Sequence, residues 1–346
     1  MVQANGVDLH VELLDPPAEP NPGPLPGSAA EPNPDVLPAA VAVPEHLPTV
    51  GTGADPGRGA GATAAPTVVL IHGLASDSLA SWYFTLAKPL ADSGRRVVMY
   101  DLRGHGHSER PPTGYTLGDL VDDLAALLAA LDIAGPVHLF GNSFGGTIAY
   151  AYAARHPDRV AGIVAVESAP PTPAWMGRVA RRLERAADLL PRPAAVAALA
   201  AGRGAAFVRR ARATGEMLAA TTLARELPSS PLPSAAQLNT IGVPVLCVYG
   251  ADSAVVELAG EVTRLLPRVR TVVLPGGRHT ILVDQPEKLR RLVLSWLREE
   301  CGVAPTGPAH PHRDHIPQEV PGWTPPSPAG RSSSATAGAA PPSFPT

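Results

Sequence analysis

One short motif in the 346-residue chain combines a serine with the glycines that a catalytic turn needs. Residues 141–145 read Gly-Asn-Ser-Phe-Gly and stand between an apolar, strand-like run at 137–140 and a helix-prone run at 144–155. A serine on such a strand-to-helix turn is exposed at the edge of a sheet, and the N-terminus of the helix favours negative charge. The motif therefore predicts Ser143 as a nucleophile. The competing interpretation is a glycine-rich turn capped by a serine.

A serine hydroxyl is a poor nucleophile at neutral pH, so it needs a base. His279 follows the last predicted strand, at 270–274, and precedes the last predicted helix, at 286–300. That position puts it at the same carboxyl-terminal edge of a parallel sheet as Ser143. Most other histidines lie within predicted elements or in proline-rich segments. We therefore expect His279 to be the base.

An acid must orient the imidazole and stabilise its charged form, and two residues are candidates. Asp252 follows the predicted strand at 243–249, and Glu167 ends the predicted strand at 161–166. Asp252 could instead cap a helix, and Glu167 could be a charge at the rim of the sheet. The residue types alone leave both candidates open.

The elements that must position these residues alternate between strands and helices. Residues 116–131 have apolar positions at a helical period, with Thr116 and Asp119 in the spacing of a capping box. Residues 7–14 alternate apolar and polar side chains, as a half-buried strand does. Short β-branched runs at 67–71 and 96–100 are typical of buried parallel strands. Repeated strand-helix units predict an α/β fold with a doubly wound, mostly parallel sheet.

Proline content divides the chain. Of its 41 prolines, 13 lie in residues 15–66 and 11 in residues 303–346, so these segments cannot bury enough apolar surface to fold. Residues 170–240 are rich in Ala, Arg and Leu and show no strand pattern, so we expect them to form an inserted helical cap. The predicted organisation is a first strand at 1–14, a disordered insertion at 15–66, core at 67–169, cap at 170–240, core at 241–302 and a disordered tail at 303–346.

The composition of the chain indicates which classes of binding partner are expected. The net charge of −3 provides no basic field for nucleic acid or a membrane surface. The chain has no secretion-type start, and its two cysteines lie in unlike settings, which favours a cytoplasmic protein without a disulfide. The histidines at 310–315 lie in a proline-rich context without fixed geometry, so we expect no metal site. A small-molecule substrate is the expected partner.

Five motifs in order give the chain its resemblance to the α/β-hydrolases, the superfamily of esterases, lipases and C–C hydrolases. The resemblance covers residues 7–300 outside the two proline-rich segments. The motifs are His72-Gly73, Asp101-Leu102-Arg103-Gly104-His105-Gly106-His107-Ser108, Gly141-Asn142-Ser143-Phe144-Gly145-Gly146, Tyr249-Gly250-Ala251-Asp252 and Gly277-Arg278-His279. The resemblance implies the α/β-hydrolase fold, a triad in the order serine, acid, histidine, and no cofactor.

The resemblance also implies roles for further residues. Asp252 lies in the loop where the family usually carries its acid, so it is preferred to Glu167, although its spacing is one residue tighter than the commonest form. The backbone N–H groups of Leu74 and Phe144 correspond to the oxyanion hole. The loop-bracing residues of the family correspond to Asp101 and Arg103.

The function expected from these residues is a serine hydrolase that cleaves a small to medium, largely apolar ester, thioester or lactone through an acyl-enzyme. Asn142, Trp175 and Met176 are expected to contact the substrate, although the cap side chains could equally attach the cap to the core. One alternative is a biosynthetic tailoring enzyme that performs thioester release, cyclisation or C–C cleavage on the same scaffold. The other is a catalytically silent binding protein.

Overall fold

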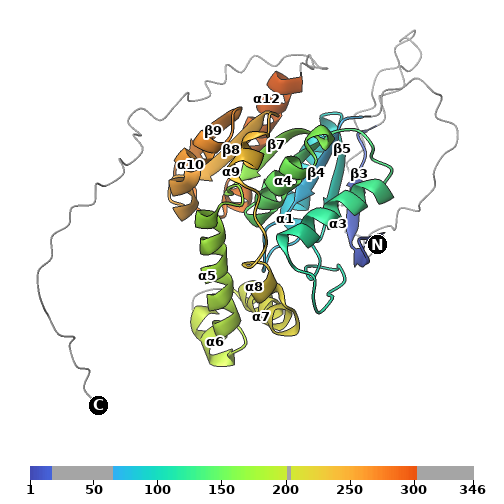
Figure 1. Cartoon of the computed structure of the whole chain (residues 1–346). Helices are drawn as coiled ribbons and strands as arrows, with labels where there is room; N and C mark the ends of the chain where they lie inside the picture. Colours follow the sequence, from blue (N-terminus) through green and yellow to red (C-terminus); the bar gives the residue numbers. More distant parts are fainter. Residues whose placement is uncertain (18–64, 201–203, 302–346) are drawn as a thin grey trace, which may run out of the picture. The chain divides into compact units, whose positions relative to one another are not determined.

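A computed structural model of the chain describes residues 1–17, 65–200 and 204–301, and Figure 1 shows their arrangement. Most of the insertion predicted at 15–66 and all of the tail predicted at 303–346 lie outside the described residues. No described helix is both long enough and apolar enough to cross a membrane.

The centre of the fold is a seven-stranded sheet with the strand order β3-β5-β4-β6-β7-β8-β9. All neighbouring strands are parallel except β3, which runs antiparallel to β5 at the edge. This sheet confirms the predicted α/β class. The strands are β3 (Val11–Leu14), β4 (Thr67–Ile71), β5 (Arg96–Tyr100), β6 (Val137–Asn142), β7 (Val160–Val166), β8 (Val245–Gly250) and β9 (Val269–Leu274).

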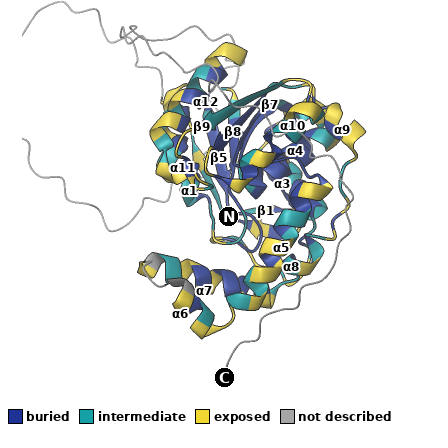
Figure 2. Ribbon diagram, turned by 90° about the vertical axis from the view of Figure 1, so that its left-hand side faces the viewer, coloured by how far each residue is buried: buried dark blue, intermediate teal, exposed yellow. Residues whose placement is uncertain are grey.

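Helices cover both faces of the sheet, and this is why its central strands are apolar at most positions. In β4, Val69 and Ile71 pack into one hydrophobic core, and Val68 and Leu70 pack into the other. The helices that contribute to the first core include α3 (Leu117–Ala130), α4 (Phe144–Arg155) and α10 (Ala259–Leu265). Those of the second core are α1 (Ala80–Trp82), η1 (Tyr83–Ala87), α2 (Lys88–Asp92), α11 (Ile281–Asp284) and α12 (Pro286–Cys301). Figure 2 shows the buried strands between these layers.

Two local predictions for helices are confirmed. Thr116 caps α3 through a capping box in which its side chain accepts the N–H of Asp119, and the Asp119 carboxylate accepts the N–H of Thr116. Pro286 begins α12, where its missing N–H has no intrahelical partner to lose. Between β4 and β5, residues 80–92 form α1, the π-helical η1 and α2 in succession.

The single strand predicted at residues 7–14 is wrong. The structure divides it into β2 (Val7–Leu9), which pairs with β1 (Val2–Ala4) in a hairpin, and β3. The break falls at His10, whose N–H donates to Ser108 Oγ and whose C=O accepts the N–H of Asp101. These contacts to the loop after β5 replace a continuous strand ladder.

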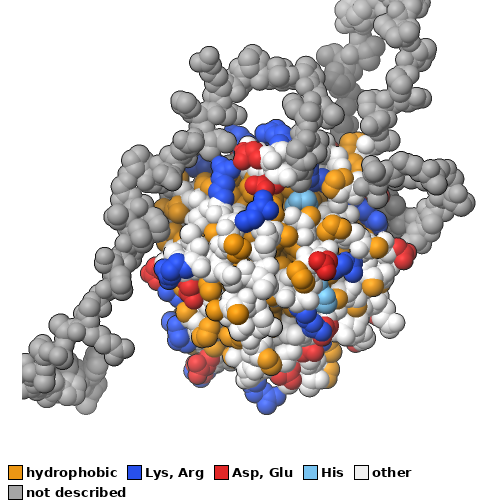
Figure 3. Space-filling view, turned by 45° about the horizontal axis from the view of Figure 1, so that its top comes forward, with side chains coloured by type: hydrophobic (Ala, Val, Ile, Leu, Met, Phe, Trp, Pro, Cys, Tyr) orange, Lys and Arg blue, Asp and Glu red, His pale blue; other side chains and the backbone are white. Residues whose placement is uncertain are grey.

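The described residues between β7 and β8 form helices and no strand, as predicted. They are α5 (Pro173–Leu189), α6 (Pro193–Ala200), α7 (Ala205–Ala220), α8 (Leu223–Glu226) and α9 (Ala235–Asn239), with the short 3-10 helices η2 (Pro157–Arg159) and η3 (Ala254–Leu258) flanking β7 and β8. In Figure 1, α5, α6, α7 and α8 gather below the sheet. On the face shown in Figure 3, basic and acidic side chains are interspersed with hydrophobic ones.

Candidate active site

Ser143 occupies a sharp turn between β6 and α4. Its backbone has φ 51° and ψ −119°, a conformation that a residue with a side chain rarely adopts. The two motif glycines make the turn sterically feasible. A Cβ on Gly141 would lie 2.1 Å from the amide nitrogen of Gly146, and a Cβ on Gly145 would lie 2.2 Å from the carbonyl oxygen of Ile71. Any larger residue at either position would therefore push the turn out of place.

Such backbone strain costs about 1–3 kcal/mol and persists only where the surroundings fix it. The N–H of Ser143 donates to the carbonyl oxygen of Val166 at 2.8 Å, which ties the turn to the end of β7. The side chain of Ser143 is half-buried. The strained position thus presents a hydroxyl at the carboxyl-terminal edge of the sheet.

His279 reaches this hydroxyl from a position 136 residues later in the chain. Its Nε2 lies 3.1 Å from Oγ of Ser143, and its side chain is 35% exposed. The loop that carries it follows β9 and packs tightly on the end of β8, because a Cβ on Gly250 would lie 2.2 Å from the carbonyl oxygen of Gly277. The predicted meeting of Ser143 and His279 is thus present in the structure.

The carboxylate beside His279 belongs to Glu167. Its Oε2 lies 3.0 Å from Nδ1 of His279, and Glu167 is fully buried. Glu167 follows the last residue of β7 and has φ 53°, so it is a second non-glycine residue in a strained conformation at the end of a strand. Its N–H donates to the carbonyl oxygen of Val248, which fixes this turn to β8.

The placement expected for Asp252 needs correction. Asp252 is exposed, and no hydrogen bond or ion pair joins its side chain to His279 within the described residues. Its N–H donates to the carbonyl oxygen of Gly277 at 2.8 Å, so the chain turns at this point. The next residue, Ser253, is buried, and its side chain reaches Glu167 instead.

The end of β8 therefore binds the carboxylate rather than supplying one. The Ser253 hydroxyl donates to Oε2 of Glu167, and the N–H of Gly250 donates to Oε1. A buried carboxylate needs such donors, because burial without partners strongly disfavours its charged form. Both oxygens of Glu167 are thus held, and Oε2 contacts His279 as well.

The expected oxyanion groups lie beside the nucleophile turn. A Cβ on Gly73 would lie 3.3 Å from Cβ of Ser143, so the loop that contains Leu74 lies against Ser143. Within the described residues, no hydrogen bond occupies the N–H of Leu74 or the N–H of Phe144. Both donors are available to an oxygen atom.

Asp77 and His105 hold this loop in position. Oδ2 of Asp77 accepts the N–H of Gly73 at 2.7 Å and the side-chain amide of Asn142 at 3.1 Å, which joins the loop to the nucleophile turn. Nε2 of His105 accepts the N–H of Ala75 at 3.0 Å. Ala75 has φ 69°, a third strained residue near the site.

The protonation of His105 follows from these contacts. Its Nδ1 lies 2.9 Å from the carbonyl oxygen of Arg103, so Nδ1 carries the proton and Nε2 is free to accept. Burial, together with the neighbouring His72, lowers the pKa of His105 to about 4. The ring is therefore neutral at pH 7, as its acceptor role requires.

The expected bracing roles of the loop after β5 are confirmed. Asp101 accepts the N–H groups of Leu79 and His107, and Arg103 forms a buried ion pair with Asp123. Burial of Asp101 favours its neutral form, but the hydrogen bonds from His107 and Leu79 outweigh it and lower the pKa of the carboxyl group.

The expected substrate residues have different surroundings. Trp175 and Met176 are 1% and 4% exposed and belong to a hydrophobic core. The Trp175 indole N–H donates to Oγ1 of Thr147 at 2.6 Å, which attaches α5 to α4. Oδ1 of Asn142 is buried, and it has no hydrogen-bond partner among the described residues.

Ser253 and Asp77 were not identified from the sequence. The contact of Ser253 with Glu167 depends on the ends of β7 and β8 lying side by side, and a single sequence gives no direct signal of this. Asp77 contacts Gly73 locally, but its contact with Asn142 joins residues 65 positions apart.

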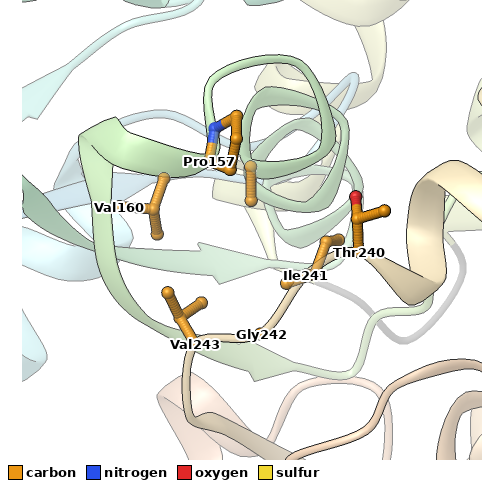
Figure 4. A pocket seen from close by; sticks show the side chains of 7 residues that line it. Pro157, Val160, Thr240, Ile241, Gly242 and Val243 are labelled. Atoms are coloured by element: carbon orange, nitrogen blue, oxygen red, sulfur yellow. The ribbon is translucent and has the colours of Figure 1, made fainter.

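Two further features of the described residues bear on ligand binding. They contain no group of three or more His, Cys, Asp or Glu residues that could hold a metal ion, and the histidines at 310–315 lie outside the described residues. A cavity of about 230 Å³ includes Val160 and Thr240 in its wall (Figure 4). Val160 begins β7 whereas Glu167 follows its end, so this cavity lies at the opposite edge of the sheet.

Comparison with known proteins agrees with the fold. Residues 66–208 match the family described as alpha/beta hydrolase fold. The chain is 30% identical over 254 residues to the 2-(acetamidomethylene)succinate hydrolase of Mesorhizobium japonicum, and the match covers 67% of this chain and 88% of that protein.

Two solved structures are similar at the level of the fold. One is from a study of carboxylesterases of the thaumarchaeon Nitrososphaera gargenis, with 26% identity, a TM-score of 0.59 and coverage of 69% of this chain and 92% of that chain. The other is a thermophilic esterase from Thermogutta terrifontis, with 27% identity and a TM-score of 0.51. That match covers 68% of this chain and 90% of the esterase chain. The relatives support a hydrolase activity. With the sheet and the five motifs, these matches show that the chain belongs to the α/β-hydrolase family.

Proposed function

We propose that the protein is a serine hydrolase that cleaves a carboxylic ester, thioester or lactone through an acyl-enzyme. One observation supports this most strongly: Oγ of Ser143, the ring of His279 and the carboxylate of Glu167 form a continuous chain with separations of 3.1 Å and 3.0 Å. A nucleophile, a base and an orienting acid in hydrogen-bond reach are what acyl transfer to a hydroxyl requires.

The proposed reaction begins with Nε2 of His279 taking the proton of Ser143 as Oγ attacks the acyl carbon. The Glu167 carboxylate accepts the Nδ1–H of His279, which keeps Nε2 unprotonated before the attack and stabilises the imidazolium after it. His279 then gives its proton to the leaving group. Water, deprotonated by His279, then attacks the acyl carbon, and His279 returns that proton to Oγ of Ser143 as the bond to the serine breaks and the acid is released.

The developing oxyanion is stabilised by main-chain donors. We assign this role to the N–H groups of Leu74 and Phe144. Phe144 directly follows Ser143, the loop that contains Leu74 lies against Ser143, and neither N–H group has another partner among the described residues. The N-terminus of α4 adds favourable charge at the same position. Loss of one such donor typically lowers the rate by ~10²–10³.

The proposed substrates are small to medium and largely apolar. The similarity to carboxylesterases supports the ester class. Asn142 adjoins Ser143, and in this proposal it acts by joining the nucleophile turn to Asp77 through its side-chain amide. Trp175 and Met176 act in this proposal through the position of α5, since both side chains are buried in the core.

Hydrolysis of a panel of nitrophenyl esters with acyl chains of two to eight carbons tests the proposal. The wild-type protein is expected to turn over at least one ester, and Ser143→Ala and His279→Ala are expected to reduce kcat to near the background rate. A folded wild type that hydrolyses no member of the panel and reacts with no fluorophosphonate would favour a silent binding protein.

A second candidate is a tailoring enzyme that acts on a more complex acyl or C–C bond. It is favoured by the Mesorhizobium relative, whose name specifies 2-(acetamidomethylene)succinate rather than a simple ester. The same serine and histidine would act. Turnover of that compound, of a carrier-bound thioester or of a diketone, without turnover of nitrophenyl esters, would select this candidate.

A further inference from the structure

Ser253 contacts the reaction machinery without facing the reacting atoms. It lies three residues beyond the end of β8, is 6% exposed, and donates its hydroxyl hydrogen to Oε2 of Glu167. The same Oε2 atom lies 3.0 Å from Nδ1 of His279. Ser253 and the imidazole therefore share one carboxylate oxygen.

The other oxygen of Glu167 is held by the same segment of chain. Oε1 accepts the N–H of Gly250, the last residue of β8. Without Ser253, Oε2 would be held only by Nδ1 of His279, the group that it has to orient. The contact from Ser253 thus fixes Oε2 independently of the imidazole.

The position of Oε2 decides the state of His279. A neutral imidazole carries its proton on either nitrogen, and the partner of one nitrogen selects the tautomer. When Oε2 accepts from Nδ1, the proton is kept on Nδ1, and Nε2 stays free to accept the proton of Ser143. Loss of this orientation would populate the tautomer that cannot act as a base.

We propose that Ser253 is a positioning residue of the catalytic centre, which keeps Oε2 of Glu167 on Nδ1 of His279. The inference rests on the proposed function. The loop after β8, where Asp252 was expected to provide the acid, contributes a hydroxyl donor to an acid that comes from β7. Ser253 acts through Glu167 and touches no substrate.

A purely structural role has to be separated from this one, because Oγ of Ser253 also accepts the N–H of Val255 at 3.2 Å and caps η3. Ser253→Ala loses both contacts. Ser253→Thr keeps a hydroxyl for both, and Ser253→Cys keeps a similar shape with a weak donor. Ser230→Ala is the matched control, since Ser230 is 7% exposed and its Oγ accepts the N–H of Leu117 away from Glu167 and His279.

Ester kinetics of the four variants provide the first test. Because a hydrogen bond to a charged group is removed, Ser253→Ala is expected to lower kcat by about 10- to 100-fold with KM changed by less than about 3-fold. Ser253→Cys should show an intermediate loss, Ser253→Thr should recover most of the rate, and Ser230→Ala should match wild type. Wild-type kcat in Ser253→Ala or Ser253→Cys, or no recovery in Ser253→Thr, would overturn the inference.

The tautomer of His279 provides a test that does not need turnover. With ¹⁵N-labelled histidine, the His279 ring signals can be assigned by their loss in His279→Ala. Wild type is expected to show a protonated Nδ1 and a bare Nε2, and Ser253→Ala to show a mixture of both tautomers. If Ser253→Cys and Ser253→Ala both keep the wild-type pattern, Ser253 has only a structural role.

The two proposals fail in different ways. If wild type shows neither ester turnover nor fluorophosphonate labelling, the proposed function is wrong, and the tautomer measurement still decides whether Ser253 orients Glu167. If wild type is active and Ser253→Ala is equally active, the inference alone is wrong.

Discussion

Oε2 of Glu167 lies 3.0 Å from Nδ1 of His279, although 112 positions separate the two residues in the chain. Glu167→Gln keeps the size of the side chain but removes the charge that stabilises the imidazolium. We expect it to lower kcat by roughly 10²–10⁴-fold with little change in KM. Steady-state kinetics on the best nitrophenyl ester measure this effect.

Asp252→Asn removes the carboxylate that the usual family pattern favours. Because Asp252 is exposed and has no contact with His279 in the described residues, this variant is expected to keep a kcat within about 3-fold of wild type. A large loss in Asp252→Asn together with a small loss in Glu167→Gln would show that the acid comes from the loop after β8.

The close approach of Gly250 to Gly277 positions the loop of His279. A Cβ at Gly250 would lie 2.2 Å from a backbone carbonyl oxygen, so Gly250→Ala must displace one of the two segments. We expect a loss of at least about 2 kcal/mol in the free energy of unfolding, together with a loss of ester turnover. Urea denaturation and kinetics check both.

Gly260→Ala is the matched control for that substitution. Gly260 lies in α10, and the nearest atom to its added Cβ is the end of the Arg264 side chain at 3.6 Å. The change should leave turnover unaltered and stabilise the helix by about 0.5–1 kcal/mol. Similar destabilisation by both substitutions would contradict a specific role for the contact between Gly250 and Gly277.

The stability of the protein should fall as the pH drops from about 6.5 to about 4. Burial lowers the pKa of His105 from its ordinary value of 6.5 to about 4, so in this window the unfolded chain binds a proton that the folded chain does not. The contribution is complete above pH 6.5 and is lost as the pH falls.

A variant without a titratable group at position 105 separates the contribution of His105 from other effects of pH on stability. Between pH 7 and pH 5, wild type is expected to lose about 2 kcal/mol more of its unfolding free energy than His105→Gln loses. His138, whose pKa burial also lowers to about 4, contributes to both proteins and cancels in the comparison. Equal losses in the two proteins would show that His105 is not a neutral acceptor for Ala75.

The sequence predicts much of this fold because its signals are local. The apolar runs of β4 and β5 and the capping box of α3 each depend on residues that are adjacent in the chain. Ser143 was predictable for the same reason, since the glycines at 141 and 145 that its turn requires lie next to it.

The rest depends on contacts between distant segments. The choice between Glu167 and Asp252 is decided by which side chain turns inward where β7 and β8 end, and the buried Ser253 takes the inward position on the β8 side. The break of the first predicted strand at His10 likewise depends on hydrogen bonds to residues 98 and 91 positions away. Neither relation has a signature within one stretch of sequence.

The central claim is that His279 activates the hydroxyl of Ser143. Intact-mass measurement after reaction with a fluorophosphonate tests it directly, because the probe adds one group to an activated serine. We predict a single adduct on wild type, located on Ser143 by peptide mapping, no adduct on Ser143→Ala, and labelling slowed by at least about 100-fold in His279→Ala. Unlabelled, folded wild-type protein, or labelling that persists in Ser143→Ala, would contradict the account.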